Sequence, residues 1–563
     1  MFTQEEKDIL HKYVTSADAN IFAIRGMEGM VGAAYARYSR AKGGFREVLL
    51  KEFIQEGHID PKHADELIQR VLIAYGDDSV GELEGAHVSF EQISMLAAKE
   101  IEDRRIGGSP IEQSTRYVLY DQKDDNGNWK YYRGPDVLNA SFGKQYQETM
   151  DFIFETYASL IEPLRSYLES QKPLSEAEYD INGDSIKEKL TDLIDEKQIK
   201  AFKQTYIFEL RAKACDILRS LLPVATLTNV GMFGNGRFFQ NLISYLLTSE
   251  ISENYSVAKG TQEALKEIIP QYIRRAKRSD YNAAINKNMY RLVKELLGDL
   301  KPEMPDALPS FHLMDRGEEI LEKRIRHEGV AAHEALQEVS DIHMLAAMLY
   351  PYSDLPLFQI RKAVDHMNRS TREKIIETYV SERQSRRDRP GRALEDGYPY
   401  TFDMVTNFGV YKDLQRHRIN TQTRQLFTTK LGFYFSPELE NINAMEKVKL
   451  CVEKAHLLYE SMAKENPLLA QYAVLHGHYI RWTMGFNDRE AMHLLELRST
   501  PQGHPNYRLA AQKMHKLINE RSKLRGGLMK FVDHEDYYWS RADSEAKQRV
   551  KEAKLDETLK HIG

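Results

Sequence analysis

The sequence predicts a helix-rich protein built from two related halves, and three observations lead to that prediction. Several segments carry apolar residues at helical spacing, and phrases from the first half return in the same order in the second. Between them lies KPEMPDALP, residues 301–309, whose three prolines suit a linker. We therefore expect a first domain over residues 1–300, with an insertion at about 121–205, and a second over 310–563.

Helices account for most of the periodic segments. Ile93, Leu96, Ala97 and Ile101 form one stripe within 91–105, and Gly107 and Gly108 follow as a stop signal. The same reasoning predicts helices over 186–222, 256–276, 287–298 and 505–522. Strand signals are weaker and fall on 115–120, which is rich in strand-favouring residues, and on Tyr131-Tyr132 after the turn-like DDNGNW.

Three pairs of phrases carry the repeat. Their order is the same in both halves, which makes a duplicated domain a better explanation than chance. The pairs are Ala33-Ala34-Tyr35 with Ala346-Ala347, Arg104-Arg105-Ile106 with Arg416-His417-Arg418, and Asn235-Gly236-Arg237 with Asn487-Asp488-Arg489.

Composition excludes several classes of protein. The net charge of −6 argues against a general nucleic-acid binder, because counterion release needs a basic face. The two cysteines, Cys215 and Cys451, form no CxxC motif, so we expect no metal site and no disulfide scaffold. The first residues, MFTQEEKDIL, are acidic where a signal peptide would be basic, so we expect no signal peptide. We find no uninterrupted apolar run long enough for a membrane span, no P-loop and no GxGxxG motif after a strand. The expectation is a cytoplasmic protein that acts without a membrane.

Two arginine-rich clusters are candidates for ligand binding. Arg104 and Arg105 precede a Gly-Gly-Ser-Pro loop and then Ser114 and Arg116, a combination of fixed cations and exposed N–H groups that suits a phosphate. His417 stands between two arginines, which disfavours its cation, so a neutral imidazole could bond a polar ligand at either nitrogen. The alternative for both clusters is a solvated C-terminal end of a helix, where the helix dipole favours positively charged arginines.

A third candidate is a helix face. Asn487, Leu494 and Arg498 fall at helical intervals, so one face could present both an amide and a guanidinium. The alternative is an ordinary amphipathic helix.

Together these phrases resemble the flavin-dependent thymidylate synthases, also called the thymidylate synthase-complementing family. The family's signature is Arg-His-Arg, seven residues and then Ser, usually within Glu-x-Ser-x-Arg-Tyr. The first half resembles it at Arg104-Arg105-Ile106 and at Glu112 to Tyr117, and the second half at Arg416-His417-Arg418. Arg219 to Pro223 resembles the family's Arg-x-x-Leu-Pro phrase. Ser79-Val80-Gly81-Glu82 resembles its Ser-Val-x-Glu phrase, with Glu84 as the alternative glutamate when the two sequences are counted without a gap.

Neither half keeps the complete set. In the first half, Arg105 replaces the signature histidine, Ile106 the second signature arginine, and Leu246 the later arginine of the Asn-x-Arg helix. In the second half, Leu426 replaces the signature serine, Arg424 the glutamate, and Thr428 the arginine of Ser-x-Arg. The losses are complementary, so the resemblance implies one working site built from both halves and one decayed site. It also implies an α+β fold with a mixed sheet in each half, and a homodimer equivalent to the family's tetramer.

The resemblance further implies the reaction and its residues. The family methylates dUMP to dTMP with FAD as cofactor and with methylenetetrahydrofolate and NADPH as co-substrates. We expect Ser114, Arg116 and Arg498 to be catalytic, and the substrate to be bound by Glu112, Gln113, Ser114, Arg116, Arg219 and Arg498. We expect the cofactor to be bound by Arg416, His417, Arg418, Asn487, Arg489 and Ser79. The alternatives are a diverged flavin enzyme that modifies another pyrimidine nucleotide, and a non-catalytic protein that binds a nucleotide or flavin.

Overall fold

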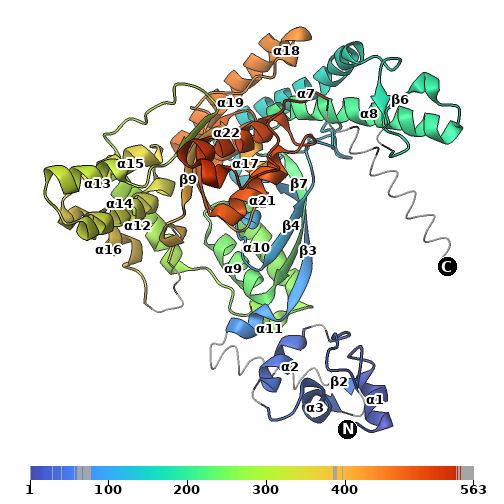
Figure 1. Cartoon of the computed structure of the whole chain (residues 1–563), viewed down its shortest axis with the longest axis vertical. Helices are drawn as coiled ribbons and strands as arrows, with labels where there is room; N and C mark the ends of the chain where they lie inside the picture. Colours follow the sequence, from blue (N-terminus) through green and yellow to red (C-terminus); the bar gives the residue numbers. More distant parts are fainter. Residues whose placement is uncertain are drawn as a thin grey trace. The chain divides into compact units, whose positions relative to one another are not determined.

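The computed structural model, whose helices and strands are labelled in Figure 1, divides into two compact units. Unit 1 consists of Met1–Gln113 and Thr228–Ala283, and unit 2 of Ser114–Leu227 and Ala284–Gly563. The described residues are 2–27, 29–39, 41–55, 58–59, 66, 78–184, 186–384, 388, 390–395, 397–539, 542 and 546. The division of the sequence into domains at 1–300 and 310–563 stays a prediction.

Unit 1 combines short helices with a three-stranded sheet. Its helices are α1 (Gln4–Leu10), α2 (Val31–Tyr38), α3 (Phe45–Val48), η1 (Leu49–Phe53), η3 (Asp78–Glu82), α5 (Met95–Glu102), α9 (Gly236–Thr248), α10 (Ser252–Lys266) and α11 (Pro270–Ile273). Its strands are β1 (Ile54–Gln55), β2 (His58–Ile59), β3 (Gly85–Ser94), β4 (Gly108–Glu112) and β7 (Leu227–Asn235). The sheet order is β3-β7-β4.

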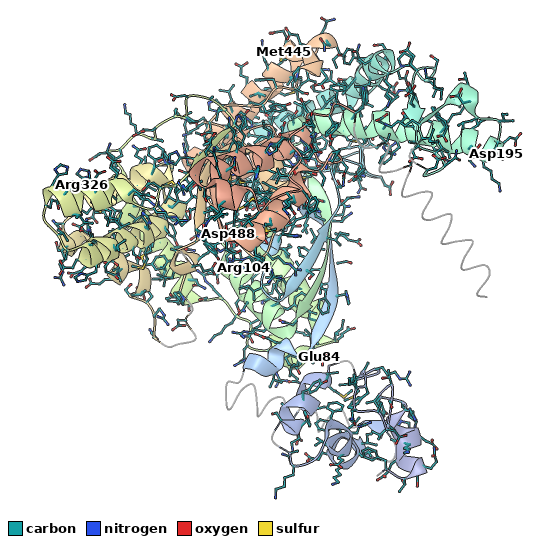
Figure 2. The ribbon with its side chains drawn as sticks, viewed as in Figure 1. Glu84, Arg104, Asp195, Arg326, Met445 and Asp488 are labelled. Atoms are coloured by element: carbon teal, nitrogen blue, oxygen red, sulfur yellow. The ribbon has the colours of Figure 1, made fainter. Side chains whose placement is uncertain are left out.

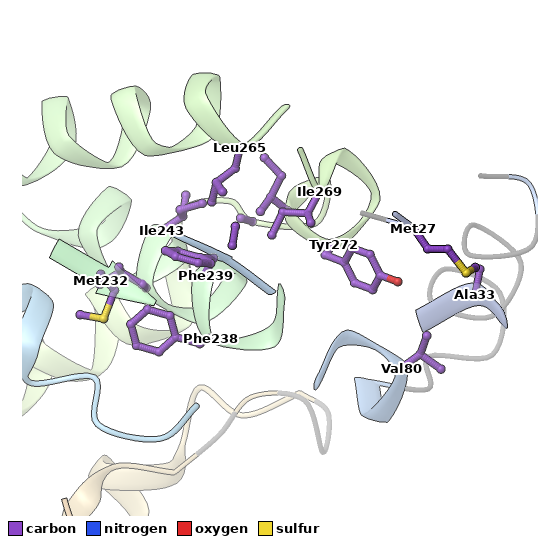
Figure 3. Packing of buried hydrophobic residues seen from close by; sticks show 14 of the residues in the cluster. Met27, Ala33, Val80, Met232, Phe238, Phe239, Ile243, Leu265, Ile269 and Tyr272 are labelled. Carbon is purple, nitrogen blue, oxygen red and sulfur yellow. The ribbon is translucent and has the colours of Figure 1, made fainter. Parts of the chain in front are cut away.

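The core of unit 1 forms where α9 and α10 meet the buried side chains of the sheet (Figure 3). Phe238 and Phe239 follow the cap residue Asn235 in the first turn of α9, and their rings meet edge to face at 5.2 Å. A Cβ at Gly236 would come within 2.6 Å of the Tyr272 side chain, so only glycine allows this ring to pack against the start of α9.

Unit 2 contains the longer helices. Up to residue 380 its helices are α6 (Pro135–Leu138), α7 (Gly143–Gln171), η4 (Leu190–Asp192), α8 (Glu196–Leu218), η5 (Arg219–Leu221), most of α12 (Asp280–Leu297), α13 (Glu318–Glu322), η6 (Lys323–His327), α14 (Ala332–Leu349), η7 (Tyr350–Tyr352), α15 (Leu357–Asp365) and α16 (Arg369–Val380). From there they are η8 (Arg392–Glu395), α17 (Phe408–Leu414), α18 (Glu438–Asn441), α19 (Met445–Glu465), α20 (Pro467–Ala470), η9 (Gln471–Ala473), α21 (Asp488–Ser499), α22 (Pro505–Arg521) and α23 (Lys523–Gly526).

The sheet of unit 2 has the order β8-β9-β11-β10. Its strands are β8 (Ser310–Leu313), β9 (Tyr400–Asn407), β10 (Thr421–Arg424) and β11 (Tyr479–Phe486), and the unit also holds the short pair β5 (Glu178–Tyr179) and β6 (Glu188–Lys189). Every residue of β11 is buried, and Trp482 at its centre donates from Nε1 to Thr406 Oγ1 at 2.9 Å. Helix α7, from the first half of the sequence, packs against α8 and against α19 from the second half.

The two units repeat one topology, as the duplicated phrases predict. Strands β3, β4 and β7 correspond to β9, β10 and β11, and in both sheets the last of the three lies between the other two. Helix α9 begins at the cap Asn235 and α21 at the cap Asn487, and each cap side chain accepts a hydrogen bond from the backbone three residues on. The α+β class is therefore confirmed, although the pairings β4–β7, β8–β9, β9–β11 and β10–β11 are antiparallel where mixed sheets were expected.

Most predicted helices are present with shifted ends. Residues 91–94 of the predicted helix 91–105 belong to strand β3, because α5 begins only after its cap Ser94. The predicted helix 186–222 begins only after the cap Asp195. The prediction of a strand at 115–120 is wrong: the amides of Tyr117 and Val118 both donate to the Ser114 carbonyl, which closes a local turn. The segment 301–309 carries neither helix nor strand, as expected of a linker. Among the described residues, no helix combines the length and the apolar character needed to cross a membrane.

Candidate functional site

A buried cluster of charged and aromatic side chains lies in unit 2, and we call it the composite cluster. Its members come from both halves of the sequence. They are Arg116, Asp216 and Arg219 from the first half and Asp413, His417, Glu490, Arg498, His504 and Tyr507 from the second.

Arg116 joins the two halves inside this cluster. Its Nε and Nη2 atoms lie 3.0 and 3.4 Å from the two carboxylate oxygens of Asp216 in α8. Nη1 donates to Tyr507 Oη at 2.9 Å, and Nη2 also donates to the Gln502 carbonyl at 3.1 Å. Burial raises the pKa of the Asp216 carboxyl, and the charge of Arg116 opposes that shift. Arg116 therefore acts as an internal cross-link, with its donors directed to the protein.

Arg219 differs from Arg116 because its donors are not satisfied. The side chain is 3% exposed, and Nη2 lies 2.9 Å from Asp413 Oδ2 in α17. This is an ion pair, but neither Nη1 nor Nη2 makes a well-directed hydrogen bond to a described residue. A Cβ at Gly409 would come within 2.9 Å of Nη2, so the glycine leaves room for the guanidinium. Burial alone would raise the pKa of Asp413, but Arg219 and Arg116 outweigh it and hold that pKa well below its usual range.

His417 is held by two partners within the protein. Its Nδ1 lies 2.8 Å from Glu490 Oε1, and its Nε2 accepts from Arg498 Nε at 2.8 Å. Because arginine only donates, the imidazole carries its proton on Nδ1 and donates it to Glu490. Burial lowers the pKa of His417, with Glu490 opposing and Arg498 adding to the shift. The expected neutral imidazole is supported, but the expectation of a free nitrogen for a ligand is wrong, since both nitrogens already have partners.

Arg498 lies in the last turn of α21 and connects this pair to Tyr507. Its guanidinium carbon lies 5.7 Å from the centre of the Tyr507 ring, and that of Arg116 lies 5.4 Å from it. Burial lowers the pKa of Arg498, and Tyr507 and Asp413 oppose the shift. Helix α22, which carries Tyr507, is capped by His504. His504 accepts from the Asn506 amide and donates from Nε2 to the Asp216 carbonyl at 3.2 Å.

Exposed polar residues flank the bond between His417 and Glu490. Arg418 follows His417, Arg489 precedes Glu490, and both are exposed. Asn487 is exposed too, and its side chain caps α21 by accepting from the Glu490 amide at 3.1 Å. Two exposed guanidinium groups near the N-terminus of a twelve-residue helix fit the diphosphate of a dinucleotide cofactor. The residues expected to hold FAD thus include a set whose chemistry suits it.

Some expected site residues lie in unit 1. Glu112 ends β4 and forms an ion pair with the buried Lys99 at 3.0 Å, and Lys99 also contacts Glu102. Gln113 donates its amide to the Asn229 carbonyl and accepts from the Asn229 side chain. Ser114 begins unit 2, where its Oγ accepts from the Arg116 amide at 3.3 Å. Ser79 lies in η3, but its side chain is outside the described residues.

The expected phosphate loop at 107–110 is wrong. Gly108 to Glu112 form strand β4, and pairing with β7 uses the backbone that was expected to face a ligand. Arg104, labelled in Figure 2, places its guanidinium 3.7 Å from the centre of the Tyr245 ring. The Arg104 part of this first-half cluster therefore packs within unit 1, whereas Ser114 and Arg116 belong to unit 2.

Sequence reasoning missed five members of the composite cluster: Asp216, Asp413, Glu490, His504 and Tyr507. Two of them could have been found from local patterns. Asp216 lies three residues before Arg219, and Glu490 is the third helical residue after a cap. No local pattern marks the pairing of Asp413 with Arg219 or of Tyr507 with Arg116, because these residues are far apart in the sequence.

Comparisons with known proteins agree with the repeated topology. A family profile described as thymidylate synthase complementing protein matches residues 27–271 and again residues 337–522. The chain is 35% identical to a UPF0159 protein of Chlamydia muridarum over 98% of this chain and 99% of the relative. It is 35% identical to a UPF0159 protein of Chlamydia pneumoniae, over 97% and 98%. It is 31% identical to a UPF0159 protein of Thermoplasma acidophilum, over 92% and 98%.

Proposed function

Because the chain belongs to the thymidylate synthase complementing protein family, we propose that it is a flavin-dependent thymidylate synthase whose working site combines residues of both repeats. The observation that carries the proposal is the junction at Tyr507. There Arg116 from the first repeat and Arg498 from the second contact the same side chain, and Arg498 also bonds His417. The complementary losses in the two halves are consistent with one site of this kind.

Within this site, Arg219 is the residue best suited to the phosphate of dUMP. Its terminal nitrogens make no well-directed hydrogen bond to a described residue, and a guanidinium fork suits a phosphate. Asp413 would move aside as the phosphate enters. Arg498, held by the neutral His417, would orient the uracil and polarise a carbonyl as charge develops. Arg116 and Ser114 would hold the nucleotide-binding loop in place, because the Arg116 amide donates to Ser114 Oγ and closes a turn there.

The proposed cofactor is FAD, held by Arg418, Asn487 and Arg489, with Arg416 and Ser79 as further expected contacts. When bound and reduced, FAD would supply a hydride, while methylenetetrahydrofolate would supply the carbon and NADPH the reducing electrons. The balanced reaction consumes dUMP, methylenetetrahydrofolate, NADPH and a proton, and releases dTMP, tetrahydrofolate and NADP⁺. The chain's own residues bind and orient these molecules and exclude water. We further propose a homodimer, because two chains would supply as many repeats as the family's tetramer.

One observation favours a second candidate, a diverged flavin enzyme with another pyrimidine nucleotide as substrate. Arg116 and Arg219 each face a carboxylate, Asp216 and Asp413, which lowers the positive charge available to a phosphate dianion. A substrate that carries less negative charge would fit such a site better. The identity of the reaction product distinguishes the two candidates.

The test uses the purified full chain reconstituted with FAD and desalted. Retained visible flavin absorbance, followed by dTMP formation from dUMP, methylenetetrahydrofolate and NADPH, is the expected result. Arg219→Lys should lose dUMP turnover and keep bound flavin, because Arg219 is assigned to the substrate. Arg369→Lys is the matched control, since this side chain is 90% exposed in α16 and should leave turnover unchanged.

Two results would refute the proposal. A chain that retains no flavin under any condition is not a flavoenzyme. The second result is a chain that retains flavin and makes no dTMP, but consumes NADPH with another pyrimidine nucleotide. That result would support the second candidate function.

A further inference from the structure

We propose that unit 2 carries a second anion site, a cavity lined by arginines that binds the phosphate group of a small organic molecule. Two adjoining hollows of about 370 and 250 Å³ form it, and they share Arg316 and Arg525. Arg361 lines the larger hollow and Arg521 the smaller. We call this feature the arginine cavity. It includes no residue of the composite cluster, so it goes beyond the proposed function.

Different elements of unit 2 hold these arginines in place. Arg521, the last residue of α22, donates from Nη2 to the carbonyls of Leu313 and Met314, at 3.1 and 2.9 Å. Arg361 in α15 is 6% exposed and donates to the Asp315 carbonyl at 3.1 Å. The segment after β8, the end of α22 and the middle of α15 thus all contribute to the two hollows of the arginine cavity.

The charge of the wall is in surplus. Arg316 reaches only the Pro399 carbonyl, at 3.5 Å, and neither Arg316 nor Arg521 has a carboxylate within ion-pair distance in the described part of the chain. Arg525 does have one, since it lies 2.9 Å from Asp488, which is labelled in Figure 2. The exposed heads of Arg316 and Arg521 therefore form no ion pair with a described residue.

The two carboxylates in the wall are already used by the backbone. Asp315 accepts from the Gly317 amide, and Glu318 accepts from the Arg316 amide at 2.6 Å. They cap the turn before α13 but keep their negative charges, so the four arginines exceed these two carboxylates and Asp488 by one formal charge.

These properties select a phosphate as the ligand group. A guanidinium carries five N–H donors, so carbonyl bonds at Arg316 and Arg521 leave several for an anion. Planar forks bind phosphate oxygens in pairs, and several forks around one hollow suit a dianion better than a carboxylate. Tyr398 and Pro399 line the same hollow and offer apolar surface to the organic part of the ligand. The volume is within the usual range for small-molecule sites.

Calorimetric titration of the full chain with inorganic phosphate, at fixed ionic strength set with chloride, tests the proposal. The expected result is saturable binding that Arg316→Gln weakens at least tenfold. Arg521→Gln should do the same, but its bonds to Leu313 and Met314 also hold the fold, so Arg316→Gln is the decisive variant. Arg369→Gln, an exposed arginine of the same unit outside the cavity, should keep the wild-type affinity.

Two outcomes would overturn the assignment. Either phosphate gives no saturable heat beyond that of chloride, or Arg316→Gln binds phosphate as tightly as the wild type does. If Arg219→Gln abolishes phosphate binding and Arg316→Gln does not, the phosphate binds in the composite cluster instead. The result also separates the two proposals, because dTMP formation can succeed or fail independently of it.

Discussion

Arg498 donates its Nε hydrogen to Nε2 of His417 at 2.8 Å, so a residue expected to bind substrate is bonded to one expected to bind cofactor. The bond fixes the imidazole proton on Nδ1, where Glu490 accepts it. Any ligand that reaches one of these side chains therefore acts on the other.

Arg498→Lys should lower dTMP formation by roughly 10- to 100-fold, because a hydrogen bond to a charged group contributes about 1.5–3 kcal/mol. Lysine keeps the charge but has no Nε–H directed at His417. Nitrogen NMR of the imidazole should report a loss of the single Nδ1–H tautomer along with the rate. Arg369→Lys is the control for the conservative change, and an unaltered tautomer together with full activity would contradict the role given to Arg498.

A mixture of Arg116→Ala and Arg498→Ala chains should remain inactive. Both arginines contact Tyr507 within one compact unit, so each working site needs both of them from the same chain. The measurement is dTMP formation by the two variants expressed together. Recovered activity would mean that sites assemble between chains.

Arg116→Met should destabilise unit 2 by about 3–5 kcal/mol, because it leaves Asp216 buried without its partner. The double variant Arg116→Met with Asp216→Leu should recover most of that loss, since it removes both charges. Chemical denaturation followed by fluorescence measures the change. Arg165→Met, which breaks only exposed pairs in α7, is the control and should change stability by less than about 1 kcal/mol.

Asp413→Asn should tighten dUMP binding roughly tenfold, because the carboxylate that competes with the phosphate for Arg219 is gone. The measurement is the dUMP-dependent rise in melting temperature, which follows the affinity. Asp216→Asn provides the comparison: its arginine is already bonded to Tyr507 and Gln502, so we expect no such gain. Equal or weaker dUMP binding by Asp413→Asn would contradict the assignment of Arg219.

Acid should weaken the fold in part through His478. Burial lowers the pKa of His478 from its ordinary value of 6.5 to about 3, and its Nδ1 accepts from the Leu475 amide. The unfolded chain takes up this proton first, so stability is lost as the pH falls below 6.5, by about 1.4 kcal/mol per pH unit. His478→Asn keeps an acceptor and does not titrate. Its unfolding free energy should fall less steeply between about pH 6.5 and 4.5, and an unchanged slope would refute this account.

Several features of the fold follow from local chemistry and were accessible from the amino-acid sequence. The asparagines at 235 and 487 cap equivalent helices, because a short polar side chain can accept the backbone hydrogen three residues on. Three prolines in 301–309 exclude a helix there. Residue spacing along the chain was enough to predict the repeat, the helical segment 505–521 and the family resemblance. This spacing is present in the sequence whether or not the chain is folded.

The partners of the charged residues depend on tertiary structure. Arg116 and Arg219 look alike in sequence, but Asp216, Tyr507 and Gln502 accept hydrogen bonds from Arg116, whereas Arg219 has an ion pair with Asp413 and no well-directed hydrogen bond from its terminal nitrogens. His417 reads as a free imidazole, yet Glu490 and Arg498 arrive from a different helix and take both nitrogens. The reason is physical: a buried charge must find its counter-charge in space, and the nearest one is set by the packing of distant segments, not by spacing along the chain.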